Sequence, residues 1–135
     1  MDSLAFKLVP TLMVALGGAL GATTRFWVRE FLPLITGSQF PLSTVAVNLV
    51  GCFLAGLVYM WIEHSTLIWS AHKLLFFFVG FLGAFTTFSA FALESLLLYQ
   101  QGDWLKLTLH IFANCVLCLI CVFVGGWLGV KLAGH

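Results

Sequence analysis

The stretch GFLGAFTTFSAF, residues 80–91, decides how the chain folds, because it interrupts a long apolar segment with residues that weaken a helix. Glycine and β-branched threonine both have low helix propensity. If the segment crosses a membrane, a break there would free backbone groups at a depth without water. Such groups survive only when they are buried in protein, bind an ion or line water. Freed carbonyls would suit a cation and freed amides an anion. The alternative is an unbroken helix whose Thr and Ser side chains bond back to carbonyls.

The composition places this segment in a membrane protein. Hydrophobic residues make up 61% of the 135 residues and charged residues 8%, whereas soluble domains carry about 25% charged residues. A soluble fold of this length could not bury so much apolar surface, so the surrounding solvent must be lipid. The net charge is +1, and no basic run suggests a nucleic-acid partner. The length predicts a single domain, residues 1–135, and we expect a membrane function other than that of an enzyme.

Four segments are long and apolar enough to cross a bilayer, which takes about 20 residues. We predict an all-α membrane protein with transmembrane helices at residues 5–29, 41–63, 72–99 and 104–132, the third helix being broken in the middle of the membrane. The first connection is predicted from the turn residues Pro33, Gly37, Ser38, Gln39 and Pro41. Aromatic residues near the predicted helix ends form the expected interfacial belt: Trp27, Trp61, Trp69, Tyr99 and Trp104.

The positive charges are shared equally between the two sides of this topology. Four spans put both termini and the second connection on one side. That side carries three positive residues, Lys7, Lys73 and Lys131. The opposite side also carries three, Arg25, Arg29 and Lys106. The positive-inside rule therefore favours neither orientation. Either short loops carry too few charges for the rule, or the subunit inserts both ways up and forms an antiparallel homodimer with a two-fold axis in the membrane plane.

Small residues recur at a four-residue spacing on three of the predicted helices. The pairs are Gly17 with Gly21, Cys52 with Gly56, and Gly125 with Gly129. This spacing is typical of helices that pack closely in membranes. It indicates helix association without deciding whether the partner helix belongs to the same subunit.

Asn48 and a pair of phenylalanines are candidates for contact with an ion. Asn48 lies near the start of the second span, and its amide offers two donors. It would either donate to a dehydrated anion or make a hydrogen bond between helices. Phe88 and Phe91 are three residues apart and share a helix face. Aromatic rings have a positive edge that could touch an anion, although core or lipid-facing packing is the ordinary role of such a pair.

The fourth span carries a polar track. His110, Asn114 and Cys118 recur every four residues and therefore share one face of the helix. They would either line one wall of a pore or make hydrogen bonds between helices. Cys115, Cys118 and Cys121 have a Cys-x-x-Cys-x-x-Cys spacing, which could suggest a metal site. One continuous helix rarely wraps thiolates around a metal, so we expect thiols packed between helices instead.

Two charged residues, Arg25 and Glu94, flank the first and third spans. We predict that both lie at aqueous vestibules, where Arg25 would attract anions. The alternative for Arg25 is snorkelling to the interface or a salt bridge.

Three groups of residues together resemble the Fluc/CrcB family of fluoride channels. They follow one another over nearly the whole chain, and the third group is highly specific. In this sequence they are Gly17-Gly18-x-x-Gly21-x-x-x-Arg25, then Val47-Asn48-Leu49-x-Gly51, then Gly83-x-x-Thr86-Thr87-Phe88-Ser89-x-Phe91 with Glu94.

The resemblance implies an antiparallel, dual-topology homodimer with two pores, embedded in a bacterial inner membrane. The fluoride pathway that it implies is lined by Asn48, Phe88, Phe91, Asn114 and Cys118. It also implies a structural sodium ion at the dimer interface, held by the main-chain carbonyls of Gly83 and Thr86. The sequence departs from the family pattern at Cys118, where serine is usual, and at Ser43, where glycine is common.

The expected function is passive export of fluoride from the cytoplasm, which would reduce its toxicity. Burying a bare ion costs tens of kcal/mol, so a conducting site must replace water without holding the ion too firmly. Amide and hydroxyl donors with aromatic edges meet both requirements. A negative cell interior favours expulsion of an anion by about 2.3 kcal/mol per 100 mV.

The residues alone leave two other functions open. A proton-coupled multidrug transporter would need an ionisable carboxylate deep in a helix, and the candidate, Glu94, is near a helix end. A haem-anchoring bundle would need paired axial histidines on facing helices. His110 lies within a predicted span, whereas His64 and His72 lie near loops.

Overall fold

The computed structural model describes residues 2–37, 40–66 and 68–134, and these residues form helices and their connections. The elements are α1 (Asp2–Thr36), α2 (Leu42–His64), α3 (Ala71–Leu74), the π-helical segment η1 (Leu75–Leu82), α4 (Gly83–Phe85), α5 (Phe88–Gln100), α6 (Trp104–Phe112), the π-helical segment η2 (Ala113–Leu117) and α7 (Cys118–Leu132). Four helical stretches are long and apolar enough to cross a membrane: Lys7–Thr36, Leu42–His64, Ala71–Gln100 and Trp104–Leu132. The prediction of four long apolar helices is confirmed.

Helix α1 is longer than predicted, because it continues past residue 29 to Thr36 and includes Pro33. The assignment of Pro33 to the first connection is therefore wrong. A proline removes the hydrogen bond to the carbonyl four residues earlier and crowds that carbonyl, yet α1 continues through Pro33, as it does through Pro10 near its other end. Gly37 ends the helix with a positive φ of 59°, and its N–H donates to the Pro33 carbonyl at 2.8 Å. The predicted turn residues Ser38 and Gln39 lie outside the described residues.

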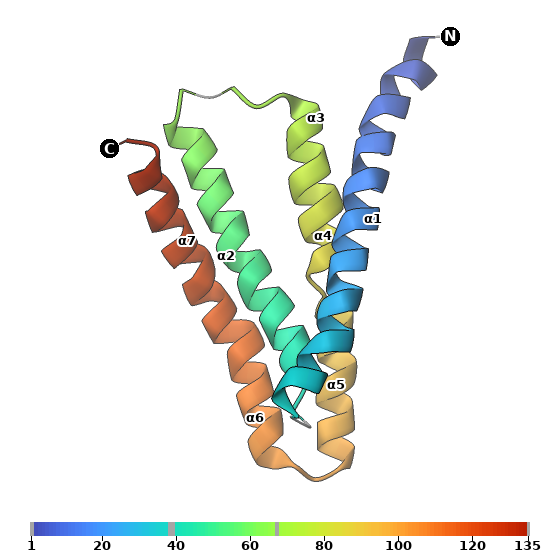
Figure 1. Ribbon diagram of the computed structural model, residues 1–135, viewed down its shortest axis with the longest axis vertical. Coiled ribbons are helices and arrows are strands. Elements are labelled where there is room, and N and C mark those ends of the chain that lie inside the picture. The colour runs from blue at the N-terminus through green and yellow to red at the C-terminus, as the bar shows by residue number, and fades with distance from the viewer. Residues whose placement is uncertain (1, 38–39, 67, 135) are drawn as a thin grey trace.

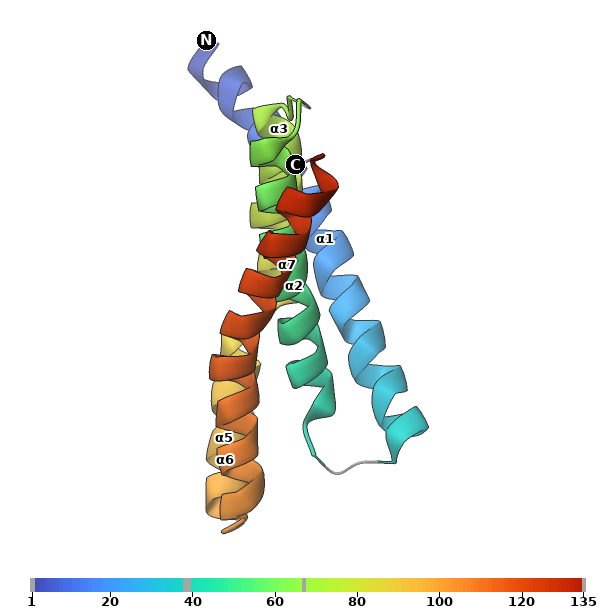
Figure 2. The same cartoon turned by 90° about the vertical axis from the view of Figure 1, so that its left-hand side faces the viewer.

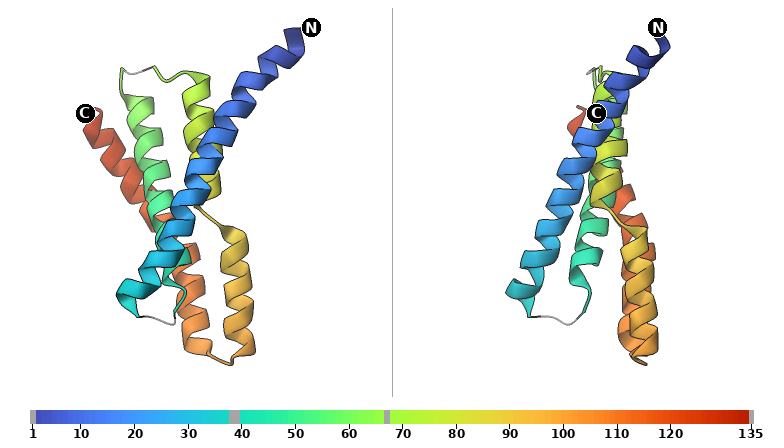
Figure 3. Two further views of the ribbon diagram at one scale, coloured as in Figure 1. Left: turned by 45° about the vertical axis from the view of Figure 1, so that its right-hand side comes forward. Right: turned by 90° about the vertical axis from the view of Figure 1, so that its right-hand side faces the viewer.

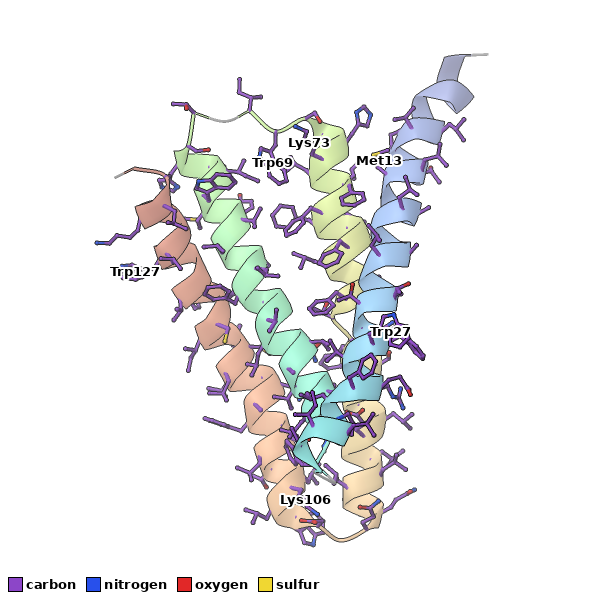
Figure 4. The ribbon with its side chains drawn as sticks, in the orientation of Figure 1. Met13, Trp27, Trp69, Lys73, Lys106 and Trp127 are labelled. Atoms are coloured by element: carbon purple, nitrogen blue, oxygen red, sulfur yellow. The ribbon has the colours of Figure 1, made fainter. Side chains whose placement is uncertain are left out.

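The helices are arranged as two closely packed pairs. Helix α2 lies along α7, and α1 lies along η1 and α4 (Figures 1 and 2). Both termini and the connection between α2 and α3 are at one end of the molecule, while the other two connections are at the opposite end (Figure 1). Lys73 and Lys106 mark these two ends (Figure 4). Positive charge is therefore present at both ends, as the sequence indicates.

Glycines let the helices of each pair approach closely. On α1, a Cβ atom added at Gly17 or Gly21 would collide with backbone carbonyls of η1. On the other pair, a Cβ atom added at Gly56 of α2, or at Gly125 or Gly129 of α7, would collide with a carbonyl of the facing helix. Such contacts require a hydrogen atom in place of a side chain. The predicted small-residue pairs thus pack helices of the same subunit together.

Much of the apolar surface faces outward. Leu34 is 78% exposed and Phe123 is 76% exposed, and large apolar side chains project from all the long helices (Figure 4). Exposed apolar patches of this extent mark surfaces that meet lipid or another protein. The polar side chains described below are instead gathered inside, where α2, α5 and η2 meet.

Candidate functional site

The chain leaves the helical conformation between α4 and α5. Thr86 and Thr87 have extended backbones, with φ and ψ of −79° and 158°, and of −153° and 115°. The Thr86 hydroxyl and N–H both donate to the Leu82 carbonyl, at 2.9 and 3.0 Å, which closes the preceding turn. Thr87 caps α5, because its hydroxyl accepts a hydrogen bond from the Ala90 N–H at 3.2 Å. The link is visible between α4 and α5 in Figure 3.

Asn48 of α2 ties this link to the rest of the molecule. Its Oδ1 atom accepts a hydrogen bond from the Thr87 N–H at 2.8 Å, and its Nδ2 atom donates to the Thr87 carbonyl at 3.1 Å. Both residues are 8% exposed. The Asn48 side chain therefore replaces the helical hydrogen-bond partners that Thr87 has lost. A backbone group left unpaired at this depth would cost several kcal/mol.

Two backbone carbonyls lose their helical donors at the same place. In a continuous α-helix the Thr87 N–H would bond the Gly83 carbonyl, and the Ala90 N–H would bond the Thr86 carbonyl. Here the first N–H donates to Asn48 and the second to the Thr87 hydroxyl. Gly83 and Thr86 are the two residues predicted to offer carbonyls to a cation, and the diversion of these donors fits that chemistry.

A second asparagine continues the polar contacts into the fourth span. Asn48 Nδ2 donates to Asn114 Oδ1 at 2.7 Å, and Asn114 Nδ2 donates to the His110 carbonyl at 3.0 Å. Asn114 lies in η2, and π-helical turns inside α-helices are frequent at functional sites. Both N–H groups of Asn48 are occupied by protein acceptors, so an anion that binds there must exchange with one of them.

The cysteines of the fourth span do not form a metal site within the described ranges of the chain. Cys118 is buried and its thiol contacts the thiol of Cys52 on α2. Cys115 is exposed and Cys121 is half-buried. Cys118 thus lies on the inner face of α7, one turn beyond Asn114, as its position in the predicted track requires.

The two phenylalanines contact each other but differ in burial. The ring centroids of Phe88 and Phe91 are 5.2 Å apart at an interplanar angle of 67°, an edge-to-face contact. Phe91 is 7% exposed, whereas Phe88 is 76% exposed. Phe91 faces the polar track, since its ring lies 5.2 Å from that of His110. Phe88 points away from the subunit and is available to a partner surface.

A pocket of about 420 Å³ lies among α1, α2 and α5. Arg25 and Arg29 of α1 line it, together with Thr44 and Thr87. Arg25 is the predicted vestibule residue, whereas the sequence places Arg29 only in the balance of positive charge. Its four-residue spacing from Arg25 puts the two side chains on one helix face, and this signal could have identified it. The two positive charges make the pocket attractive to anions.

Glu94, the other predicted vestibule residue, is held at the inner side of this region. Its Oε1 atom accepts a hydrogen bond from the Thr44 hydroxyl at 2.8 Å, and its Oε2 atom lies 3.5 Å from His110 Nε2. His110 belongs to the polar track predicted from the sequence but not to the predicted pathway. It is nevertheless fully buried beside Asn114 and Glu94.

Comparisons with known proteins identify a family and several relatives. Residues 12–126 match the family model described as "CrcB-like protein, Camphor Resistance (CrcB)". A protein of Pseudoalteromonas translucida named "Fluoride-specific ion channel FluC" is 44% identical over 120 residues, which cover 89% of this chain and 96% of that protein. Proteins of the same name from Shewanella baltica and from Shewanella strain ANA-3 are 45% identical over 114 residues, which cover 84% of this chain and 90% of each relative.

Proposed function

The chain belongs to the CrcB family of fluoride-specific ion channels, and from this premise we propose how its own residues carry the ion. It is a multi-pass membrane protein and a channel, not an enzyme. This sets aside the multidrug-transporter and haem-anchoring functions. The proposed route is lined by Asn48, Phe88, Phe91, Asn114 and Cys118, and it carries fluoride passively out of the cytoplasm.

The observation that carries this proposal is the 2.7 Å hydrogen bond between Asn48 and Asn114. It joins two neutral amides, of which that of Asn48 is buried and that of Asn114 is half-buried. Fluoride is small and tightly hydrated, so its hydration shell must be replaced by strong donors. Amides can provide these donors and still release the ion, because they carry no net charge. A buried arginine would instead hold the anion by its full charge.

The phenylalanine rings supply the apolar wall of the route. Phe91 sits against the polar track, and an aromatic edge directed at the ion offers a weak positive contact. The opposite surface of the ion would meet the exposed ring of Phe88 from a partner subunit. A narrow passage of this kind would exclude chloride, which is larger.

Arg25 and Arg29 provide an entrance for anions. Their charges line a pocket whose wall also includes Thr44 and Thr87. Thr87 lines this pocket and is hydrogen-bonded to Asn48, so only Thr87 lies between an anion in the pocket and Asn48. The positive pocket raises the local concentration of fluoride, and the neutral amides beyond it carry the ion onward.

The functional unit in this proposal is an antiparallel homodimer. The balance of positive charge between the two ends, the exposed ring of Phe88 and the extensive outward-facing apolar surface all support it. An inverted copy would bring a second α4–α5 link to the first. The carbonyls of Gly83 and Thr86 from both copies would then hold a structural sodium ion at the interface, since hard cations prefer oxygen ligands.

Ion efflux from liposomes tests the function. The purified protein is reconstituted in vesicles loaded with equal concentrations of fluoride and chloride salts, and both anions are followed after a potassium gradient is released with valinomycin. We expect rapid fluoride efflux and chloride efflux no faster than from protein-free vesicles. Equal rates for the two anions would contradict the proposal.

A further inference from the structure

His110 is a fully buried histidine next to the proposed fluoride route. Its ring lies 5.2 Å from the ring of Phe91 and 5.7 Å from that of Phe40. Its side chain also touches two polar residues, Asn114 on one side and Glu94 on the other. A histidine enclosed in this way either only fills space in the core or has a protonation state that its hydrogen-bond partners determine.

The protonation state of His110 follows from a chain of hydrogen bonds that begins at a backbone amide. The Thr87 N–H can only donate, so the atom of Asn48 that accepts it at 2.8 Å must be the oxygen Oδ1. Asn48 Nδ2 must therefore be the donor to Asn114, whose Oδ1 accepts at 2.7 Å. This leaves Asn114 Nδ2 directed toward His110.

The amide of Asn114 then selects the tautomer of His110. Its Nδ2 atom lies 3.0 Å from the His110 carbonyl and 3.3 Å from His110 Nδ1. An amide nitrogen only donates, so Nδ1 must present its lone pair. The neutral ring consequently carries its proton on Nε2. One backbone N–H thus sets the direction of every donor from Thr87 to His110.

The proton on Nε2 is directed at Glu94. The Nε2 and Oε2 atoms are 3.5 Å apart, which is too long for a strong hydrogen bond. Within the described ranges neither atom has a hydrogen-bond partner, although both are buried. Among the charged groups nearby, Arg29 of α1 acts electrostatically on Glu94. Lys106 and Asp103, at the start of α6, form a 2.7 Å ion pair with each other.

A second proton on His110 would break this arrangement. It would go to Nδ1, where the new N–H would face the N–H groups of Asn114. Two donors cannot bond each other, so the Asn114 amide would have to turn and withdraw its oxygen from Asn48. The charged ring would at the same time pair with Glu94, as an imidazolium beside a carboxylate does.

We propose that His110 is a positioning residue of the fluoride route, which holds Asn114 toward Asn48 while it is neutral and releases it when it takes up a second proton. Fluoride flux through this channel therefore falls on acidification, because the Asn114 amide then leaves the position beside Asn48 in which the two amides together receive the ion. The inference rests on the proposed function, because it assumes that Asn48 and Asn114 line the route. It adds to that proposal a regulating proton and the residue that binds it.

The test measures fluoride efflux at about pH 8 and about pH 5.5, the range in which histidine titrates. Protein-free vesicles measured at each pH give the leak of hydrogen fluoride to be subtracted. We expect the wild-type rate to fall about fivefold or more at the lower pH, the effect of losing one buried hydrogen bond. His110→Asn keeps an acceptor near Nδ1 but cannot be protonated, so its ratio of the two rates should be close to one.

The matched control is the double variant His64→Gln, His72→Gln, which removes two exposed histidines and should retain the wild-type fall. A fall that persists in His110→Asn, or that disappears in the control, would overturn the inference. A wild-type rate that is high and equal at both pH values would overturn it as well, while leaving the proposed function intact. Absence of fluoride efflux at about pH 8 would instead contradict the proposed function.

The protonation of the ring can also be measured directly in the wild-type protein, without a transport assay. Nitrogen NMR of histidine-labelled channel in lipid vesicles reports which ring nitrogen carries the proton, and the signal absent from His110→Asn identifies His110. At about pH 8 we expect a protonated Nε2 and an unprotonated Nδ1. The opposite tautomer, or a ring already doubly protonated, would refute the assigned chain of donors.

Discussion

The side chain of Asn48 and the backbone of Thr87 form a reciprocal pair across two helices, with Thr87 N–H donating to Oδ1 at 2.8 Å and Nδ2 donating to the Thr87 carbonyl at 3.1 Å. Asn48 therefore does two things with one amide. It satisfies the backbone where the chain leaves its helix, and it presents its second N–H to Asn114. Structural support and the proposed ion pathway share the same atoms.

Replacing Asn48 by Asp should stop fluoride transport. The aspartate would keep an acceptor for the Thr87 N–H but would lose both donors and add a negative charge on the route. We expect fluoride efflux to fall at least tenfold, because an anion meets repulsion where it met a donor. Thermal unfolding in detergent is the control for folding. Efflux at the wild-type rate would remove Asn48 from the pathway.

The variants Phe88→Ile and Phe91→Ile should both lose fluoride transport, although they differ in their effect on the stability of the subunit. Phe91 is 7% exposed and Phe88 is 76% exposed, so only the change at Phe91 disturbs the core of the subunit, by about 1–3 kcal/mol. If both rings contact the ion, both variants should lose fluoride efflux from liposomes. If only Phe91→Ile loses efflux, the ring of Phe88 does not contact the ion during transport.

Gly125→Ala and Gly126→Ala should differ sharply in stability although the residues are neighbours. A Cβ atom at Gly125 would collide with the Phe53 carbonyl of α2, whereas at Gly126 it would meet first the Met60 side chain at 3.2 Å. A side chain can move and a helix backbone cannot. We expect Gly125→Ala to cost about 1–3 kcal/mol and Gly126→Ala much less, measured as unfolding temperature. Equal effects would argue against the close α2–α7 contact.

Removal of sodium should weaken the dimer if the carbonyls of Gly83 and Thr86 bind that ion. A ligand that binds only the assembled state stabilises it in proportion to the logarithm of its concentration. Exhaustive exchange of sodium for a bulky organic cation should therefore promote dissociation to monomers in detergent, and added sodium should reverse it. A dimer equally stable in both salts would count against the structural ion.

The sequence alone determines the number of helices and the family of this protein. A content of 61% hydrophobic and 8% charged residues requires a lipid environment, and the spacing of apolar segments gives four helices, because bilayer thickness fixes their length. Glycines at four-residue spacing indicated close packing. The motif around Thr86 and Thr87 also carried enough local chemistry to indicate the family. These features depend on residues near one another in the chain.

Tertiary structure decided what depends on residues far apart. Asn48 and Asn114 are 66 positions apart, and no local pattern shows that their amides meet. The same holds for Thr44, Glu94 and His110, which converge from three helices. Helix α1 also extends beyond its predicted end, because it continues through Pro33 to Thr36 although proline usually ends or kinks a helix. Helix formation follows from local sequence and solvent, whereas the direction of a buried hydrogen-bond chain is fixed only when the helices have packed.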